Sequence, residues 1–597
     1  MKLNIYQSLL SSRFSKQWKR IGTRRRSGVA VPLFSVYSRQ SIGIGEIPDL
    51  KLLIDWCAST QNTILQLFPM NDVGFNFRPY DAESSFAIDP MYLSVERLEN
   101  VPPHSFKKEI AVLRKKFPCG GPRVNYGIKK AKLELLKKIF SEILRRCAPQ
   151  DDGISTIREF KSFREKNKFW LRDYSRFRVL KDKFGQKSWE EWNAGADAAG
   201  SEEALFYEWL QWQVFEQFTE VKRYARKKNI FLKGDLPFLV SRDSADVWAF
   251  KDCFKLELAA GAPPDLYFAK GQRWGMPPYD WEKIEARGYD YLIEKLKYAE
   301  NFYDLFRIDH FVGIFRIWAI RHSEPLEHAG AVGQFDPADE SRWEEHGKKI
   351  LDVIAKNTKM LPCAEDLGTV PGCSARVLEE YGLPGLDVQR WTRDWDKSYD
   401  FIAPEKYRPN SVATLSTHDM AAVTAWWNFF AGSVDEDLFE IKCGRRGVDF
   451  EKVKPALFDD KRSAHGRLFW KENIGSAEYL AVLGLRQEEA LDFMDIYLSS
   501  FDERKKFLDY IQSGVFSVRK ALEKVQRAAS VFGIQLLQDW FSLDRAFKGD
   551  AWEFRINFPG TMGNQNWTLV MPVSLDKMKS MPINKTIREI NRTARRI

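Results

Sequence analysis

The chain has 597 residues, and its 92 Lys and Arg residues exceed its 82 Asp and Glu residues to give a formal net charge of +10. A hydrophobic fraction of 44% and a charged fraction of 29% are typical of globular domains and exclude a mainly disordered chain. No uncharged apolar run approaches the ~18 residues that a membrane helix needs, so no membrane is expected as a partner. Basic and acidic residues are interleaved along the chain, so the net charge does not indicate nucleic acid as a partner.

The first 45 residues contain no Asp or Glu and carry three successive arginines at 24–26. An organellar transit peptide is one interpretation, but residues 1–26 are expected to form a solvated basic leader. The seven cysteines are scattered, odd in number and without a CxxC pair. This pattern predicts reduced thiols and a cytoplasmic location, with neither a disulfide nor a zinc site. No cofactor or metal is expected.

Eight short apolar or β-branched runs, each ended by polar or turn residues, predict buried strands. They begin near Gly28, Thr63, Ile230, Tyr303, Met360, Gly385, Val412 and Val531. The intervals from the fifth run to the seventh are 25 and 27 residues, close to the ~31 residues of one unit of an eightfold strand-helix barrel. The predicted fold class is therefore α/β, a (β/α)8 TIM barrel. A doubly wound open sheet is the alternative, although no GxGxxG follows any run.

Two longer blocks, at about 95–228 and 436–529, are rich in charged and apolar residues at helical spacing. Both blocks leave from the carboxyl ends of predicted strands, where the loops of barrels build active sites. We therefore expect residues 27–597 to form one barrel that is interrupted by two large helical insertions.

Three acidic motifs end the fourth, fifth and seventh predicted strands: FRIDHF with Asp309, CAEDLG with Glu365, and STHDM with Asp419. Taken singly, each acid is more often a helix cap or a partner in a loop ion pair. Together they would converge on one rim of a barrel, as a retaining glycosidase requires of two carboxyl groups about 5 Å apart. One of them must begin protonated, which would require Glu365 to be more desolvated than Asp309.

Arg307 precedes Asp309 by two residues, so both side chains leave the same face of an extended strand. A guanidinium there would keep the carboxylate ionised, although an ordinary buried ion pair is the alternative. His310 would point to the opposite face and is expected to be structural. His418, beside the third acid, either hydrogen-bonds a sugar hydroxyl or is a structural residue, and the spacing does not decide between the two.

The segment 261–281, GAPPDLYFAKGQRWGMPPYDW, is dense in Gly, Pro and aromatic residues. Pyranose rings pack their C–H faces on aromatic rings, so Trp274 and Tyr279 are candidate glucan contacts. For any single ring a place in the core is the usual alternative. A nucleic-acid stacking platform would need a basic groove, and the local positive charge is diluted by Asp265, Asp280 and Glu282.

The chain resembles the 4-α-glucanotransferases, the amylomaltases or disproportionating enzymes of glycoside hydrolase family 77, from about Ser27 to Trp567. The resemblance rests on an ordered set of motifs: SGVAVPLFSVYS, GDLPFLVSRDSADVW, GAPPDLYFAKGQRWGMPPYDW, FRIDHF, AEDLG, TLSTHD and RINFPGTMGNQNW. It implies a (β/α)8 barrel with helical insertions and without a C-terminal β-sandwich domain. It also implies transfer of α-1,4-glucan segments from a malto-oligosaccharide donor to the 4-hydroxyl of an acceptor glucan or glucose, with net retention.

The resemblance also assigns roles to matching positions. It implies that Asp309 is the nucleophile, Glu365 the general acid/base and Asp419 the stabiliser of the transition state. The substrate-binding residues implied by the matching motifs are Arg307, His418, Tyr80, Asp235 and Asp243. The implied partners are α-1,4-glucans, namely maltose, malto-oligosaccharides and a glycogen-like or starch-like polymer.

The sequence that follows the first acid, HFVGIFRIWAI, departs from the form common in bacterial amylomaltases. It resembles the branch related to the plant cytosolic disproportionating enzymes, which implies maltose as donor and a branched glucan as acceptor. Two other hypotheses remain open. An α-amylase-type hydrolase would share the three acids, and a glucan-binding protein without activity is disfavoured because all three acids are present.

Overall fold

The computed structural model describes residues 6–102, 105–147, 157–193, 195, 200–264, 270–544, 551–561 and 563–596. At its centre lie eight short strands whose neighbours all pair in parallel. In chain order they are β1 (Arg26–Val31), β2 (Ile64–Leu67), β3 (Phe231–Leu236), β6 (Leu305–Ile308), β9 (Leu361–Ala364), β10 (Gly385–Val388), β11 (Ser411–Thr414) and β14 (Phe532–Leu536). Each of the eight predicted runs overlaps one of these strands.

The sheet closes into a barrel. Its order is β10-β11-β14-β1-β2-β3-β6-β9, so the two edge strands, β9 and β10, are consecutive in the chain. The edges meet where the Ala364 backbone N–H donates to the Pro384 carbonyl at 2.8 Å. Because both faces of a closed parallel sheet are covered, its strands are mostly apolar, and β2, β9, β11 and β14 are buried at every position. The predicted (β/α)8 fold is confirmed.

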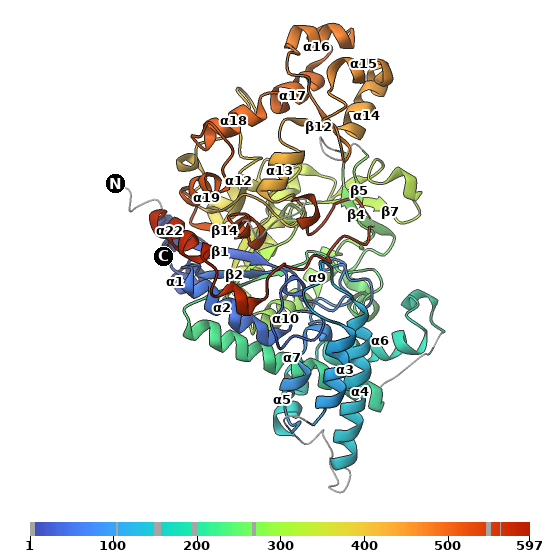
Figure 1. Cartoon of the computed structure of the whole chain (residues 1–597). Coiled ribbons are helices and arrows are strands. Elements are labelled where there is room, and N and C mark those ends of the chain that lie inside the picture. The colour runs from blue at the N-terminus through green and yellow to red at the C-terminus, as the bar shows by residue number, and fades with distance from the viewer. Residues whose placement is uncertain are drawn as a thin grey trace.

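Helices pack around the outside of the barrel (Figure 1). They include α2 (Leu50–Ser59), α7 (Glu202–Lys227), α10 (Asp290–Ala299), α11 (Trp343–Asn357), α12 (Ser374–Tyr381), α19 (Val518–Gln526) and α22 (Ile583–Thr593). In α19, Ala521, Leu522 and Val525 recur at helical spacing and are buried. Apolar residues at this spacing form one stripe along a helix, and burying that stripe fixes the helix against the barrel.

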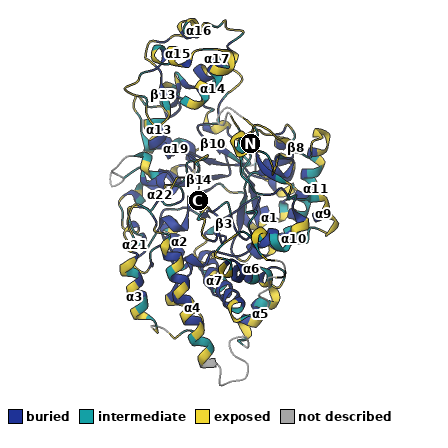
Figure 2. Cartoon of the chain, turned by 90° about the vertical axis from the view of Figure 1, so that its right-hand side faces the viewer, coloured by how far each residue is buried: buried dark blue, intermediate teal, exposed yellow. Residues whose placement is uncertain are grey.

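The first predicted insertion contains α3 (Lys107–Lys116), α4 (Gly127–Cys147), α5 (Arg158–Lys166) and α6 (Leu171–Lys183). These four helices project together from one end of the molecule (Figure 1), and their outer faces are exposed (Figure 2). The helix α7, which ends the predicted block, packs against α2 and β3. It is therefore part of the helical layer of the barrel, although it also packs on α5 and α6.

The second predicted insertion contains α14 (Glu436–Arg446), α15 (Phe450–Leu457), α16 (Ser476–Leu483) and α17 (Leu491–Ser500). They surround a hydrophobic core of their own, separate from the main core. An antiparallel pair that the helical pattern did not predict, β12 (Ser433–Asp435) and β13 (Arg467–Phe469), lies at their base. The next helix, α18 (Glu503–Tyr510), returns to the main core through Phe507.

The remaining elements are short. An antiparallel sheet in the order β5-β4-β7-β8 joins the segments that follow β3 and β6. Its strands are β4 (Leu258–Ala262), β5 (Gln272–Arg273), β7 (Ile317–Arg321) and β8 (Gln334–Asp336), and none was predicted. The other helices are α8 (Ala245–Ala249), α9 (Trp281–Ala286), α13 (Val423–Phe429), α20 (Leu537–Phe541) and α21 (Leu575–Met578).

The N-terminal segment differs from the expected solvated leader. Residues 15–21 form α1 (Ser15–Ile21), in which Trp18 is fully buried. Its indole stacks on Phe532 of β14 with ring centres 5.8 Å apart, and its Nε1 donates to the Gly382 carbonyl. Of the three successive arginines, Arg24 is exposed and Arg25 is half-buried, whereas Arg26 is the first residue of β1 and is buried. This segment therefore covers the amino-terminal end of the barrel.

After β14, the described residues form helices, turns and isolated bridges and build no β-sandwich. The last helix returns to the first strand, where Arg596 donates to the Arg26 carbonyl at 3.1 Å. The first strand and the last described residues consequently lie close together (Figure 1). Among the helices of the described residues, none is both long enough and apolar enough to cross a membrane.

Candidate active site

Three carboxylates belong to one rim of the barrel. Asp309 follows β6 directly, Glu365 follows β9 directly, and Asp419 lies five residues beyond the end of β11. Parallel barrel strands all point the same way, so their carboxyl ends surround a single opening. The fold thus gathers at one mouth three acids that are separated by 56 and 54 positions in the sequence.

Arg307 of β6 connects two of these acids. Its Nη1 donates to Asp309 Oδ1 at 2.7 Å, as the two-residue spacing predicted. Its Nη2 lies 3.6 Å from Glu365 Oε2. Because a guanidinium presents its donors in a rigid planar fork, the two carboxyl groups are kept as neighbours in a fixed arrangement.

Asp235 and Tyr80 complete the contacts around this guanidinium. Asp235 pairs in register with Arg307 across β3 and β6 and accepts from Arg307 Nη1 at 2.8 Å. Its other carboxylate oxygen accepts from the Tyr80 hydroxyl at 2.7 Å. Burial raises the pKa of Asp235 even though Arg307 opposes the shift. Asp235 is thus a buried residue beneath Arg307 and Tyr80, and its implied role in binding substrate stays a prediction.

His418 lies between Tyr80 and Asp419. Its ring stacks on Tyr80 with centres 4.9 Å apart and an interplanar angle of 16°. Its Nε2 lies 3.2 Å from Asp419 Oδ2. Trp567 packs against both rings. Tyr80, an implied substrate-binding residue, thus has one face on His418, and His418 itself is a buried member of the site.

Asp419 has the most open side chain of the three acids, with 45% of it exposed. Asn557 Nδ2 donates to its Oδ1 at 2.7 Å, and Arg555 Nη2 donates to its carbonyl at 3.1 Å. Desolvation opposes ionisation, but His418 and the hydrogen bond from Asn557 outweigh it and lower the pKa of Asp419 to about 2. Sequence analysis gave no role to Arg555 or Asn557, whose only signal was the motif RINFPG.

Glu365 has the opposite electrostatic environment. The His310 backbone N–H donates to its Oε2 at 2.7 Å. Burial raises the pKa of Glu365 to about 8, with Arg307 opposing the shift and Asp309 and Asp419 reinforcing it. His310 reaches this position in a left-handed conformation, with φ of 43°, which is uncommon for a residue other than glycine. A carboxyl group that is protonated at neutral pH can act as an acid.

The sequence model of glycoside hydrolase family 77, described as 4-alpha-glucanotransferase, matches residues 31–575. This chain belongs to that family. The 4-alpha-glucanotransferase of Chlamydia trachomatis serovar D is 31% identical over 584 residues, which are 95% of each chain. The rice protein 4-alpha-glucanotransferase DPE2 (Oryza sativa subsp. japonica) is 27% identical over 566 residues, 68% of this chain and 58% of that protein.

The fold has a solved counterpart. The structure of the amylomaltase from Streptococcus agalactiae in complex with acarbose matches 96% of this chain and 100% of its own, with a TM-score of 0.67 and 22% identity. At that identity the match supports the architecture of this family member and does not transfer individual residue roles.

In this glucanotransferase-family chain, Trp274 lies beside His310, the residue that follows Asp309. The short strands β4 and β5 carry the segment that holds it, and its ring meets His310 edge to face at 4.7 Å. Its Nε1 donates to Gln272 Oε1 at 3.0 Å. Trp274 is half-buried, so part of its ring is available to a ligand, and its contact with a glucan stays a prediction.

Tyr279 does not lie where the sequence analysis expected it. Its hydroxyl donates to the Phe238 carbonyl at 2.8 Å, and its ring is surrounded by aromatic residues that include Phe254 and Tyr291. Only 6% of its surface is exposed. In this family member Tyr279 is a core residue that supports the wall of the site, and its ring is not presented to a glucan.

Asp243, which the resemblance implies to be a substrate-binding residue, is bound elsewhere. Its Oδ2 accepts from Lys181 Nζ at 2.6 Å, and its Oδ1 accepts from the Trp189 backbone N–H at 3.1 Å. Both partners belong to the first insertion. With each carboxylate oxygen occupied, Asp243 joins that insertion to the loop after β3, and no contact places it among the three acids.

Buried ion pairs attach the first insertion to the loop 71–89, which carries Tyr80. Lys129 of α4 donates to Asp72 Oδ1 at 2.8 Å and to Asp89 Oδ2 at 2.7 Å, and all three side chains are almost fully buried. Arg178 of α6 pairs with Glu83 of the same loop. The insertion helices of this family member thereby anchor a loop of the active site.

Among the described residues of this family member, no cluster of three or more His, Cys, Asp or Glu side chains is arranged to bind a metal ion. The acids of the site are instead bound by Arg307, Asn557 and the His310 backbone. The chemistry that these side chains can perform is acid, base and nucleophilic catalysis.

Proposed function

We propose that this protein is a 4-alpha-glucanotransferase that moves α-1,4-glucan segments between malto-oligosaccharides by a retaining double displacement. One observation carries the proposal: Asp309 and Glu365 share the guanidinium of Arg307, while burial keeps the second of them protonated near neutral pH. A pair of neighbouring carboxyl groups in different protonation states is what a retaining mechanism uses.

In the first step, an ionised oxygen of Asp309 attacks the anomeric carbon as the bond to the leaving oxygen breaks. Glu365 gives its proton to that oxygen, so the shortened glucan leaves with a free hydroxyl. A β-linked glucosyl-enzyme remains. Before the attack, Arg307 neutralises the charge of the Asp309 carboxylate and fixes its orientation.

In the second step, the ionised Glu365 takes the proton from the 4-hydroxyl of an acceptor glucan. The acceptor oxygen attacks the anomeric carbon, the bond to Asp309 breaks, and an α-1,4 linkage is restored. Asp419, kept ionised by His418 and Asn557, stabilises the positive charge that develops on the sugar in this mechanism. Half-buried Trp274 and Tyr80 provide aromatic surface for the bound chain.

The decisive assay is chromatography of the products formed from maltotriose alone. A transferase gives a ladder of longer and shorter oligomers, a hydrolase gives maltose and glucose without longer products, and a binding protein leaves the substrate unchanged. Asp309→Asn should reduce product formation by about a thousandfold or more, the order of loss when a catalytic group is removed. Near-native turnover by this variant would remove Asp309 from the nucleophile role.

Maltose as donor and a branched glucan as acceptor are the proposed natural substrates. The support is the sequence HFVGIFRIWAI and the similarity to the rice protein reported above. Incubation with maltose and glycogen should release glucose and lengthen the outer chains of the polymer. Release of glucose that does not depend on added glycogen would contradict this preference.

The proposed location is the cytoplasm. The supporting observation is that the six cysteines whose side chains the structure describes, including four that are buried, are all free thiols, as is usual in a reducing compartment. Cell fractionation with an antibody against the chain tests this proposal, and recovery from an organelle would favour the transit-peptide interpretation.

A further inference from the structure

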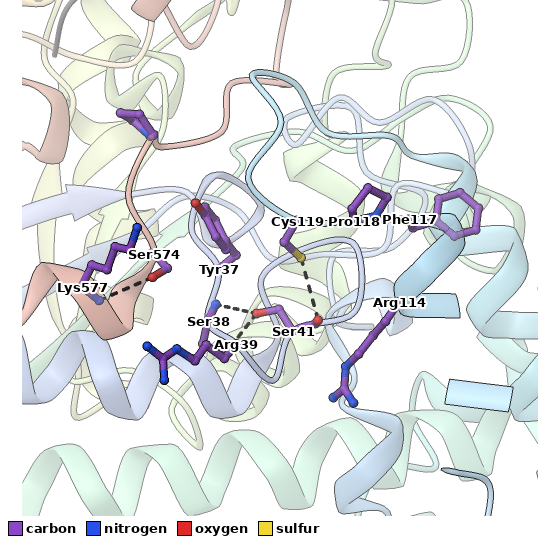
Figure 3. A pocket seen from close by; sticks show the side chains of 11 residues that line it. Tyr37, Ser38, Arg39, Ser41, Arg114, Phe117, Pro118, Cys119, Ser574 and Lys577 are labelled. Atoms are coloured by element: carbon purple, nitrogen blue, oxygen red, sulfur yellow. Dashed lines mark hydrogen bonds between the residues drawn. The ribbon is translucent and has the colours of Figure 1, made fainter. Parts of the chain in front are cut away.

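A second pocket, with a volume of about 450 Å³, lies where three segments that are distant in the sequence meet (Figure 3). They are the loop after β1, the end of α3 with its following turn, and the segment that leads into α21. None of the lining residues belongs to the active site described above. The lining consists of Tyr37, Ser38, Arg39, Ser41, Arg114, Phe117, Pro118, Cys119, Pro572, Ser574 and Lys577.

Two exposed cations of this pocket have no internal partner. Neither the Arg39 guanidinium nor the Lys577 ammonium forms an ion pair or hydrogen bond with another side chain in the part of the chain that the structure describes. In Figure 3 both lie on the same side of Tyr37. The third cation, Arg114, is paired with Glu96 at 2.8 Å, although its Nε is buried without a partner.

Two acids near the pocket accept hydrogen bonds from the protein. Asp49 lies beneath it, fully bonded to the hydroxyls of Ser38 and Ser41 at 2.6 and 2.7 Å. Asp576 accepts from the Arg39 backbone N–H at 2.9 Å. No Asp, Glu, Asn or Gln is among the lining residues. The side chains available to a ligand therefore offer hydrogen-bond donors and positive charge, with hydroxyls as their only acceptors.

This donor-rich lining discriminates between ligand classes. A neutral sugar carries hydroxyls that need both donors and acceptors, whereas a phosphate ester presents acceptor oxygens and negative charge. The cavity also has non-polar walls, formed by Phe117, Pro118 and the Tyr37 ring. The Tyr37 side chain packs against Gly120, where an added Cβ would lie 2.9 Å from the tyrosine hydroxyl. The pocket thus has room for an organic group beside an anionic one.

We propose that this pocket binds the phosphate monoester of a sugar, with the phosphate near Arg39 and Lys577 and the sugar against Tyr37 and Pro118. The site goes beyond the proposed transfer reaction and does not depend on it. The ligand could be a free hexose phosphate or a phosphate group carried by a glucan chain, since both present the same chemistry.

The pocket is joined to the active site through one segment of chain. Met571 donates its backbone N–H to the Ser35 carbonyl at 2.7 Å, and Leu575 donates to the Tyr37 carbonyl at 2.8 Å. The same segment begins at Trp567, whose ring packs on Tyr80 and His418. A ligand that bridges Arg39 and Lys577 would fasten this segment to the loop after β1.

Isothermal titration of the full chain with glucose 6-phosphate tests the proposal, with glucose and inorganic phosphate as comparison ligands. Arg39→Gln and Lys577→Met should each weaken binding about tenfold, because a hydrogen bond to a charged group contributes at least that factor. Lys585→Met, which removes an exposed cation on α22, is the matched control and should leave the affinity unchanged. Binding should also weaken as salt is raised.

The two ligand sources are separated in the Asp309→Asn background, where turnover cannot consume a glucan. Tighter binding of a phosphorylated malto-oligosaccharide than of glucose 6-phosphate assigns the site to a phosphorylated glucan, and the reverse order assigns it to a free metabolite. Absence of binding at millimolar glucose 6-phosphate, affinity unchanged in both variants, or equal affinity for glucose would overturn the proposal. Transfer activity is not the readout, so these outcomes are independent of the proposed function.

Discussion

Arg307 contacts three carboxylates, and the lengths of these contacts differ. Asp309 and Asp235 lie 2.7 and 2.8 Å from its Nη1, whereas Glu365 lies 3.6 Å from its Nη2. The attraction between opposite charges falls with distance, so Glu365 gains least from the shared guanidinium. Burial then dominates the pKa of Glu365 and raises it to about 8.

The raised pKa of Glu365 should be visible in the pH dependence of the transfer rate. Glu365 must carry a proton to act as the acid, and the protonated fraction falls as the pH rises through about 8. We therefore expect kcat for maltotriose disproportionation to decline above about pH 8. An initial-rate profile at saturating substrate measures this limb, and a decline centred near pH 5 would contradict the environment described for Glu365.

The same group should affect stability. Its pKa in the folded chain exceeds the ordinary glutamate value of 4.5, so between those two pH values the folded state binds a proton that the unfolded state has lost. The free energy of unfolding should thus fall with rising pH in that window, by at most about 1.4 kcal/mol per unit from this group. In Glu365→Gln this contribution to the pH dependence of the free energy of unfolding is absent. Denaturant titrations of the wild type and the variant across the same pH range measure the difference.

Trp274 and Tyr279 should respond differently to substitution although they lie five residues apart. Trp274→Ala removes ring surface beside His310 and should raise KM for maltotriose with a modest effect on Tm. Tyr279→Phe removes the hydrogen bond from the buried tyrosine to the partly buried Phe238 carbonyl and should cost about 1–3 kcal/mol of stability with KM nearly unchanged. Kinetics and thermal unfolding of both variants check this contrast, and a reversed pattern would restore Tyr279 to the glucan contacts.

Local sequence predicts contacts between residues that are close in the chain, and it does not predict contacts between distant ones. The contact between Arg307 and Asp309 follows from the period of two along a strand, so it was predictable. The burial of Tyr279 depends on Phe238, 41 positions away, and composition does not say which ring of a loop faces the core. Asn557 was missed for the same reason, since 138 positions separate it from Asp419.

At the level of elements, the first insertion acts on the active site through charge. Lys129 of α4 and Arg178 of α6 form ion pairs with acids of the loop 71–89, and these side chains are almost fully buried. A buried charge without its partner is costly, so this loop cannot leave the insertion without a large loss of free energy. The result is a fixed position for Tyr80 relative to Asp235.

Lys129→Met is the corresponding test. It leaves Asp72 and Asp89 buried without their shared cation, and we expect a loss of about 3–5 kcal/mol of stability. Because the loop carries Tyr80, KM should rise in the fraction that remains folded. Lys138→Met on the same helix removes an exposed pair with Glu109 and should cost less than about 1 kcal/mol. Equal effects of the two variants would contradict the anchoring role.

The sequence predicted the elements of the barrel better than those between them. Parallel strands that are buried on both faces leave continuous apolar runs, and all eight runs were recognisable. The strands β5, β8, β12 and β13 have only two or three residues each. Strands of that length carry no periodicity, because their pairing is decided by partners elsewhere in the chain.

For the whole molecule, the N-terminal segment contributes to the core of the barrel. The high positive charge and lack of acids in this region predicted a solvated leader, yet Phe14 and Trp18 are spaced four residues apart and both are fully buried. Apolar residues at that spacing share one face of a helix. The basic residues lie on the exposed side of α1, so the charge pattern predicted only that side correctly. The two aromatic residues lie on the other side and attach the helix to the core.

Trp18→Ala should therefore destabilise the barrel by about 3–5 kcal/mol, the usual cost of removing a buried tryptophan ring. Lys16→Ala, at an exposed position of the same helix, should have little effect. Hydrogen exchange can locate the change: protection should fall in the barrel strands and persist in α14–α17, which have their own core. Uniform loss of protection in both regions would show that the two cores unfold as one unit.

The closeness of the first strand to the last described residues has a practical consequence. Arg25 and Arg26 contact Ala594 and Arg596 at the amino-terminal end of the barrel, on the side opposite to the acids. A surface-coupling tag or a fused domain attached through these segments would lie on that side. An enzyme immobilised in this way would have the carboxyl-terminal opening of its barrel, which carries the acids, exposed to the solution. Long or branched polysaccharides could then reach that opening.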